Sequence, residues 1–154
     1  DRSTKKIVVR DGQVFAFTGD FGVFEPAIAW FLAGHDPDKA PKASKDGSWR
    51  LLVMGKNHLT SYTDTLPYGE PFPYPQAFGS GANYAQTAMR LGKSAAAAVA
   101  VAVEMDVFTA GPIQVVDIAK ALGLAPLPED QTYVPHPDKP GKFVVRQGKR
   151  ERAA

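Results

Sequence analysis

Two β-rich runs around the dipeptide Asp11-Gly12 constrain the fold of this chain more than any other feature. The runs KKIVVR (residues 5–10) and QVFAFT (residues 13–18) are rich in β-branched and aromatic side chains. An Asp-Gly dipeptide tolerates the positive φ angles of a two-residue primed turn. The sequence therefore predicts an antiparallel hairpin here.

A second hairpin is predicted from residues 49–54 and 58–63, which turn at Gly55-Lys56-Asn57. The segment 65–75 contains four prolines, and proline cannot donate a ladder hydrogen bond, so this segment is not expected to be a central strand. Residues 76–78 are predicted to form a short strand.

Three helices are predicted, at residues 22–33, 82–91 and 94–108, from apolar spacing and alanine content. Ser94 is the expected N-cap of the third helix. The expected apolar faces are Phe24, Ile28 and Phe31 in the first helix, and Tyr84, Ala88 and Leu91 in the second.

The C-terminal part is less regular. Residues 112–118 are predicted to be a strand, residues 119–122 a turn, and residues 142–146 a strand within a proline-rich, basic segment. Hairpins dominate and helices come in blocks, which favours an α+β fold with antiparallel sheets and helices on their outer faces.

Composition limits the class of protein. A chain of 154 residues, 44% hydrophobic and 22% charged, is typical of a globular domain. Cysteine is absent, which excludes disulfides and thiolate chemistry and fits a reducing compartment, so a cytoplasmic location is expected. No apolar run approaches the roughly 20 residues that cross a bilayer, so no membrane association is expected.

The charge is uneven, although the net charge is only +2. Residues 139–154 contain six basic residues and one acid, giving this segment a charge of about +5. A solvated tail and an arm that binds nucleic acid or a protein partner are both open interpretations. The small net charge makes nucleic acid the less favoured partner.

The Gly79-Ser80-Gly81 stretch fails the usual motif tests. A dinucleotide fingerprint needs a glycine where Tyr84 stands, and a serine-hydrolase elbow needs a glycine where Phe78 stands. The GKS at residues 92–94 lacks the first glycine of a phosphate loop. The three histidines are scattered and do not have metal-ligand spacing, so neither a cofactor nor a metal is expected.

Polar residues at strand ends and turns remain as candidates. Lys6 lies early in the first strand, and Gly19 ends the second strand, where its N–H could face a ligand. Ser80 lies at the turn before a helix. Asp106 and Thr109 lie near the end of the third helix, where the helix dipole disfavours an acid.

The order of these residues resembles a known family. The stretch 79–118, GSGANYAQTAMRLGKSAAAAVAVAVEMDVFTAGPIQVVDI, resembles the C-terminal half of proteasome β-type subunits, and is most similar to bacterial HslV and its phage-borne relatives. The stretch 5–22, KKIVVRDGQVFAFTGDFG, resembles the Lys-Lys-Ile strand and Gly-x-x-Gly of the same family. The chain departs from the family at Ala110, where the first of two glycines is usual.

The resemblance implies a four-layer αββα sandwich of the N-terminal-nucleophile hydrolases. It implies a threonine-type peptidase that acts on peptides or unfolded proteins without a cofactor, assembles into a homo-oligomeric ring and leaves open an ATPase unfoldase as a partner. Lys6 matches the active-site lysine and Gly19 the oxyanion glycine. Ser80, Asp106 and Thr109 match the residues that hold the threonine amine and orient protons.

The nucleophile has no match in the sequence, because Thr4 is too close to Lys6 and precedes the wrong strand. We expect the nucleophilic threonine to lie upstream of Asp1. The alternative is a catalytically inactive ring or assembly protein, for which a phage association is an open interpretation. A third hypothesis is a nucleic-acid-binding module. Residues 1–118 are expected to form the proteasome-like domain, N-terminally incomplete, and residues 119–154 a basic extension.

Overall fold

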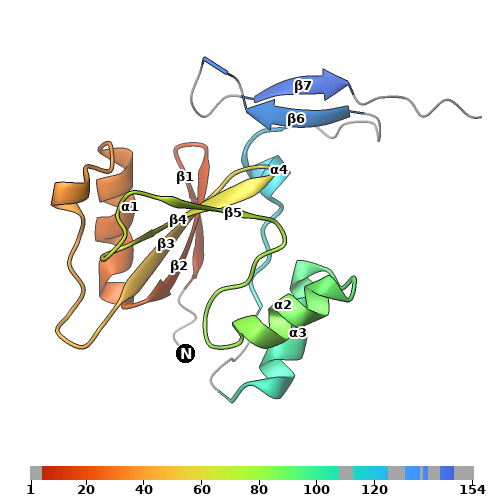
Figure 1. Ribbon diagram of the computed structural model, residues 1–154, viewed down its shortest axis with the longest axis horizontal. Helices are drawn as coiled ribbons and strands as arrows, with labels where there is room; N and C mark the ends of the chain where they lie inside the picture. The colour runs from red at the N-terminus through yellow and green to blue at the C-terminus, as the bar shows by residue number, and fades with distance from the viewer. Residues whose placement is uncertain (1–4, 108–112, 125–130, 136, 139–142, 148–154) are drawn as a thin grey trace, which may run out of the picture.

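A five-stranded antiparallel sheet forms the centre of the computed structural model, which describes residues 5–107, 113–124, 131–135, 137–138 and 143–147 (Figure 1). Each strand pairs with the next one along the chain. The strands are β1 Ile7–Arg10, β2 Gln13–Gly19, β3 Trp49–Met54, β4 His58–Thr63 and β5 Glu70–Pro73.

Both predicted hairpins are confirmed. Asp11 and Gly12 have φ angles of 52° and 72°, which is the left-handed pair that a type I′ turn needs. The second hairpin has the predicted strand bounds, and Gly55 N–H closes its turn by donating to His58 O at 2.8 Å. The proline-rich segment contributes only β5, which lies at the sheet edge as the missing N–H groups require.

Helix α1 (Phe24–Leu32) covers one face of the sheet (Figure 1). Its start follows a short 3₁₀ turn, Phe21–Val23, which the Asp20 side chain caps by accepting from Gly22 N–H at 3.1 Å. The buried core between helix and sheet is mainly aromatic, with the rings of Phe15, Phe17, Phe24, Trp30, Trp49 and Tyr62 and the aliphatic side chains of Ile28 and Leu51. Burial of these large side chains is the main source of stability in this part of the fold.

The opposite face of the sheet also contains buried side chains, among them Val14, Leu52 and Leu59. Phe78, in the segment that follows β5, packs edge-on against Phe72 with ring centroids 5.3 Å apart. The short helix α4 (Ile118–Ala121) contacts β2.

Helices α2 (Ala82–Arg90) and α3 (Ala95–Met105) form a pair that lies beside the sheet (Figure 1). Their contact is made of alanines, with Ala85 and Ala88 of α2 buried against Ala98 and Ala102 of α3. The predicted N-cap of α3 is confirmed, because Ser94 Oγ accepts from Ala97 N–H at 3.2 Å. A separate two-stranded sheet joins β6 (Gln131–Pro135) and β7 (Phe143–Gln147).

Several sequence-based predictions of local structure are wrong. Residues 76–78 are not a strand, because Ala77 N–H donates to the Gln86 side chain at 2.8 Å rather than to a neighbouring strand. Residues 113–117 are not a strand either, and Asp117 instead caps α4 by accepting from Lys120 N–H at 3.1 Å.

The predicted apolar face of α2 is also wrong in part. Tyr84 is 40% exposed and Leu91, just after the helix, is 81% exposed, whereas Ala85 lies in the contact with α3. Strand β6 was not predicted, since its sequence lies among prolines.

The chain has an α+β fold built on an antiparallel sheet, as the sequence predicts. The described residues contain one large sheet with α1 on one face. The four-layer sandwich stays a prediction.

Candidate functional site

Lys6 and Gly19 lie at the same end of the β1–β2 hairpin. Phe17 N–H donates to Lys6 O at 3.1 Å, which places Lys6 directly opposite Phe17. Gly19 follows Phe17 by two residues, so its α-carbon lies on the same face of the sheet as the Lys6 side chain. Both residues are exposed, and Lys6 Nζ lies 5.8 Å from the centroid of the Phe21 ring.

Gly19 has a conformation that only glycine accepts. Its φ is +102°, and a Cβ built on it would lie 2.2 Å from the carbonyl oxygen of Ser48. The close approach arises because Asp20 N–H donates to that same oxygen at 2.9 Å, which draws the end of β2 against the start of β3. Glycine is therefore required here by the close approach of two backbones, a constraint that the sequence did not indicate.

The register also fixes the direction of the Gly19 N–H. Successive N–H groups of an antiparallel strand point to opposite neighbours. The Phe17 N–H points to β1 and the Asp20 N–H to the β3 side, so the N–H of Gly19 points to the β1 side. A backbone donor and an ammonium group therefore lie at the same corner of the sheet.

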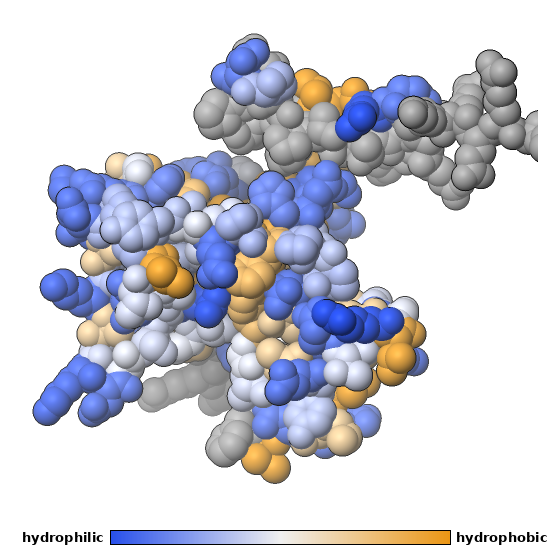
Figure 2. Space-filling view, viewed as in Figure 1, coloured by the Kyte–Doolittle hydropathy of each residue, from blue (hydrophilic) through white to orange (hydrophobic). Residues whose placement is uncertain are grey.

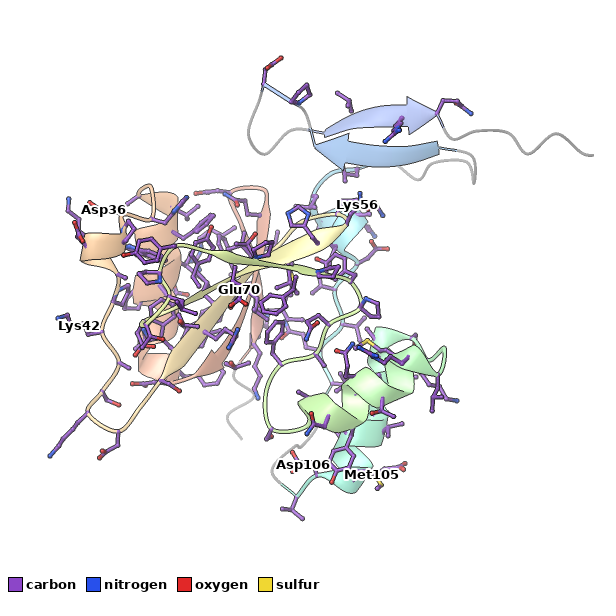
Figure 3. The ribbon with its side chains drawn as sticks, in the orientation of Figure 1. Asp36, Lys42, Lys56, Glu70, Met105 and Asp106 are labelled. Carbon is purple, nitrogen blue, oxygen red and sulfur yellow. The ribbon has the colours of Figure 1, made fainter. Side chains whose placement is uncertain are left out.

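Ser80 precedes the first residue of α2 and Asp106 follows the last residue of α3, so both flank the helix pair. Ser80 is exposed in the turn before α2, where Gly79 has φ +102° and Ala82 N–H donates to Gly79 O at 3.1 Å. Asp106 follows the last residue of α3 and has left the helical conformation. Figure 3 shows Asp106 at the end of the helix pair, beside Met105.

The predicted residues thus lie on two parts of the fold. Lys6 and Gly19 belong to the five-stranded sheet, and Ser80 and Asp106 belong to the helix pair. Thr109, the fifth predicted residue, lies outside the described residues.

A pocket of about 270 Å³ opens at the sheet corner that holds Gly19. The ends of β2 and β4, the start of β3 and the turn after β4 form its wall. The lining residues are Thr18, Gly19, Ser48, Trp49, Arg50, Thr63, Asp64, Thr65 and Leu66.

Arg50 is the cation in the lining of this pocket, and it is not among the residues that the sequence indicates. It lies between Thr18 and Thr63 in register, on the face opposite the α1 core. The alternation of β3 could have indicated its face, since Trp49 and Leu51 are the apolar partners on either side. The pocket around Arg50 forms only when separate segments of the chain fold together, so no local sequence pattern indicates it.

The described histidines and acids do not form a metal site. Among the described residues, no group of three or more such side chains lies close enough to hold a metal ion. His35 instead stacks on Phe31 with centroids 5.0 Å apart and contacts Tyr62.

Within the described ranges there is no helix with the length and apolarity to cross a membrane. Comparison of the chain with protein-family models, curated proteins and solved structures found no match.

Proposed function

We propose that this chain is a proteasome-like threonine peptidase with a four-layer αββα fold. It cleaves peptide bonds with an N-terminal threonine that precedes Asp1 in the mature protein. The support is the order of the sequence motifs, together with the placement of Lys6 and Gly19 at one corner of the sheet.

In the proposed mechanism, the free α-amine of the threonine takes the proton of its own hydroxyl, because an α-amine titrates near neutrality. The ammonium group of Lys6 favours the neutral form of that amine by its positive charge. Ser80, Asp106 and Thr109 hold the amine and orient the protons.

The observation that carries the proposal is the pair of hydrogen bonds from Phe17 N–H to Lys6 O and from Asp20 N–H to Ser48 O. By strand alternation these bonds direct the Gly19 N–H to the side of β1, where Lys6 lies. A backbone donor fixed in this way is suited to stabilise the oxyanion of a tetrahedral intermediate. The exposure of both residues leaves this corner open to a peptide.

The test begins with mass spectrometry of the mature protein and labelling with a threonine-directed covalent inhibitor. We expect a mature N-terminal threonine that carries the label. Lys6→Ala should lower the rate of peptide cleavage at least about 100-fold, whereas Lys5→Ala, on the next residue and the other face, should not. A mature N-terminus other than Thr, Ser or Cys excludes the mechanism.

A second candidate is a catalytically inactive ring or assembly protein. Exposed apolar side chains on and beside the helix pair favour it, since Val107 is 90% exposed, Leu91 81% and Met105 59%. Figure 2 shows such hydrophobic atoms at the outer parts of the pair. Native mass spectrometry that finds a stable oligomer, with no inhibitor labelling, would favour this candidate; a ring that also labels fits the peptidase, with an ATPase unfoldase as a further proposed partner.

A further inference from the structure

Arg50 lies in a polar row that crosses the end of the sheet. In register it is directly opposite Thr18 of β2 and Thr63 of β4, so the three side chains share one face. The next row inward contains Leu52 and Ser61, both buried. The row therefore marks the boundary between the packed sheet and the pocket beside Gly19.

The guanidinium group of Arg50 is held in place from two sides. Its Nη1 donates to Ser61 Oγ at 2.8 Å, and Ser61 is only 2% exposed. Its Cζ lies 4.9 Å from the centroid of the Phe78 ring, a cation–π contact. An arginine has five N–H donors in a planar fork, so anchoring one of them fixes the direction of the others.

Among the described residues, no carboxylate forms an ion pair with Arg50. The ion pair found there joins Arg10 and Glu25. Two acids lie in its neighbourhood. Asp64 lines the same pocket, and Glu70 is in register with Ser61 at the start of β5, over the middle of the sheet in Figure 3. Neither forms an ion pair with Arg50, which leaves a fixed, partly buried fork available to an external anion.

We propose that this pocket binds the carboxylate group of a peptide, with the guanidinium of Arg50 as the recognition element. That the ligand is a peptide rests on the proposed function, because the pocket adjoins the Gly19 corner. A volume of about 270 Å³ holds a single acidic side chain or a peptide C-terminus.

The charge of the pocket selects a singly charged anion. Its lining contains one cation, Arg50, and one anion, Asp64, with hydroxyl residues Thr18, Ser48, Thr63 and Thr65. A dianion such as a phosphate would meet the repulsion of Asp64 with only one guanidinium to offset it. A carboxylate accepts two parallel N–H bonds from the fork and carries a single charge.

The test measures peptide binding by isothermal titration calorimetry on the full chain. The first probe is the N-acetylated, C-amidated tripeptide Ala-Glu-Ala, and the matched probe is the same peptide with Gln in place of Glu. A third peptide has Gln and a free C-terminus, which separates the two sources of a carboxylate. We expect one of the two carboxylate peptides to bind at least about tenfold more tightly than the neutral peptide.

Substitutions of the pocket residues test whether the preference for carboxylate peptides arises in this pocket. In Arg50→Gln the new side chain can still donate to Ser61 but has no charge. This variant should lose the preference for carboxylate peptides. Arg50→Lys should keep part of it, because the charge remains and the fork is lost. Asp64→Asn should strengthen carboxylate binding, and Arg10→Gln, which removes a cation outside the pocket, should leave it unchanged.

The outcomes separate this inference from the proposed function, because binding needs no nucleophile. Carboxylate preference in a protein that the threonine-directed inhibitor does not label supports the pocket and argues against the peptidase. Equal binding of all three peptides, or a preference that survives Arg50→Gln, overturns the inference even if the threonine is labelled. If Arg50→Gln does not fold, Arg50→Lys and Asp64→Asn decide the matter.

Discussion

Gly19 shows how one residue fixes the geometry of a sheet corner. Its positive φ and the 2.2 Å approach of its built Cβ to Ser48 O are two separate obstacles to any side chain. The first costs strain in the residue itself, and the second requires β3 to move away from β2. A methyl group at this position should therefore disturb both the fold and the candidate oxyanion donor.

Gly79 offers a matched control for this prediction, because it has the same φ of +102° and no atom within 4 Å of its built Cβ. Gly79→Ala should lower the free energy of unfolding by about 1–2 kcal/mol through backbone strain alone. Gly19→Ala should exceed that loss by about 2 kcal/mol because of the added clash. Urea denaturation measures both, and equal losses would show that Ser48 yields without cost.

The buried phenol of Tyr74 should make the folded protein less stable at high pH. Burial raises the pKa of its phenol from near 10 to about 12, and its hydroxyl donates to Gly55 O at 2.8 Å. Between these pH values the folded protein keeps a proton that the unfolded chain has lost. The free energy of unfolding should therefore fall as pH rises from about 10 to about 12.

Denaturation across this pH range checks the prediction. In Tyr74→Phe the free energy of unfolding should fall less steeply with pH. Part of the remaining fall is due to Tyr62, because burial also raises the pKa of its phenol. Tyr68→Phe, at a ring that is 77% exposed, serves as the control. A profile of Tyr74→Phe identical to that of the unchanged protein would contradict this role.

The candidate site was only partly predictable at the residue scale. Lys6 and Gly19 could be selected because strand alternation and a hairpin place them from local sequence. Arg50 could not, because Ser61 and Phe78, which hold its guanidinium group, come from two other segments of the chain. No spacing rule connects residues that meet only after the sheet has formed.

At the scale of elements, the hairpins and helices were predictable where one local signal decided them. The turns at residues 11–12 and 55–57 and the N-cap at Ser94 are of this kind. Residues 76–78 resemble a strand in composition, but the Gln86 side chain binds their backbone and replaces a partner strand, accepting from Ala77 N–H and donating to Pro75 O. A side chain that replaces the hydrogen bonds of a partner strand leaves no periodic pattern in the sequence.

Removal of the N-cap of α3 should measurably lower the stability of the protein. Ser94→Ala removes the acceptor of the Ala97 N–H and should lower the free energy of unfolding by about 1 kcal/mol. Thr87→Ala is the control, because Thr87 is exposed within α2 and its hydroxyl donates to Asn83 O; it should change stability by less than about 0.5 kcal/mol. Denaturation followed by circular dichroism measures both, and equal effects would argue against the cap.

At the scale of the whole molecule, side-chain amides join parts that the hydrophobic cores do not. The aromatic core holds α1 to the sheet, and a separate alanine contact holds α2 to α3. Gln86 ties the helix pair to the segment after β5. Gln114 ties the C-terminal part to the first strand, across more than 100 residues of sequence.

Gln114 binds the outer edge of β1 as a short strand would. Its Oε1 accepts from Lys6 N–H and Ile7 N–H, each at 3.1 Å, and its Nε2 donates to Ile7 O at 2.9 Å. An edge strand with free N–H and C=O groups tends to pair with other chains, so this amide also protects the edge next to the candidate site.

Substitution of Gln114 should therefore open that edge. Gln114→Ala should lower the free energy of unfolding by about 1–2 kcal/mol and speed amide hydrogen exchange at Ile7. Gln114→Glu keeps the acceptor and loses the donor to Ile7 O, so exchange should rise less than in Gln114→Ala. Gln76→Ala, which loses only a 3.5 Å contact with Ala77 O, is the control. Unchanged exchange at Ile7 in Gln114→Ala would mean that the edge of β1 is held by other contacts.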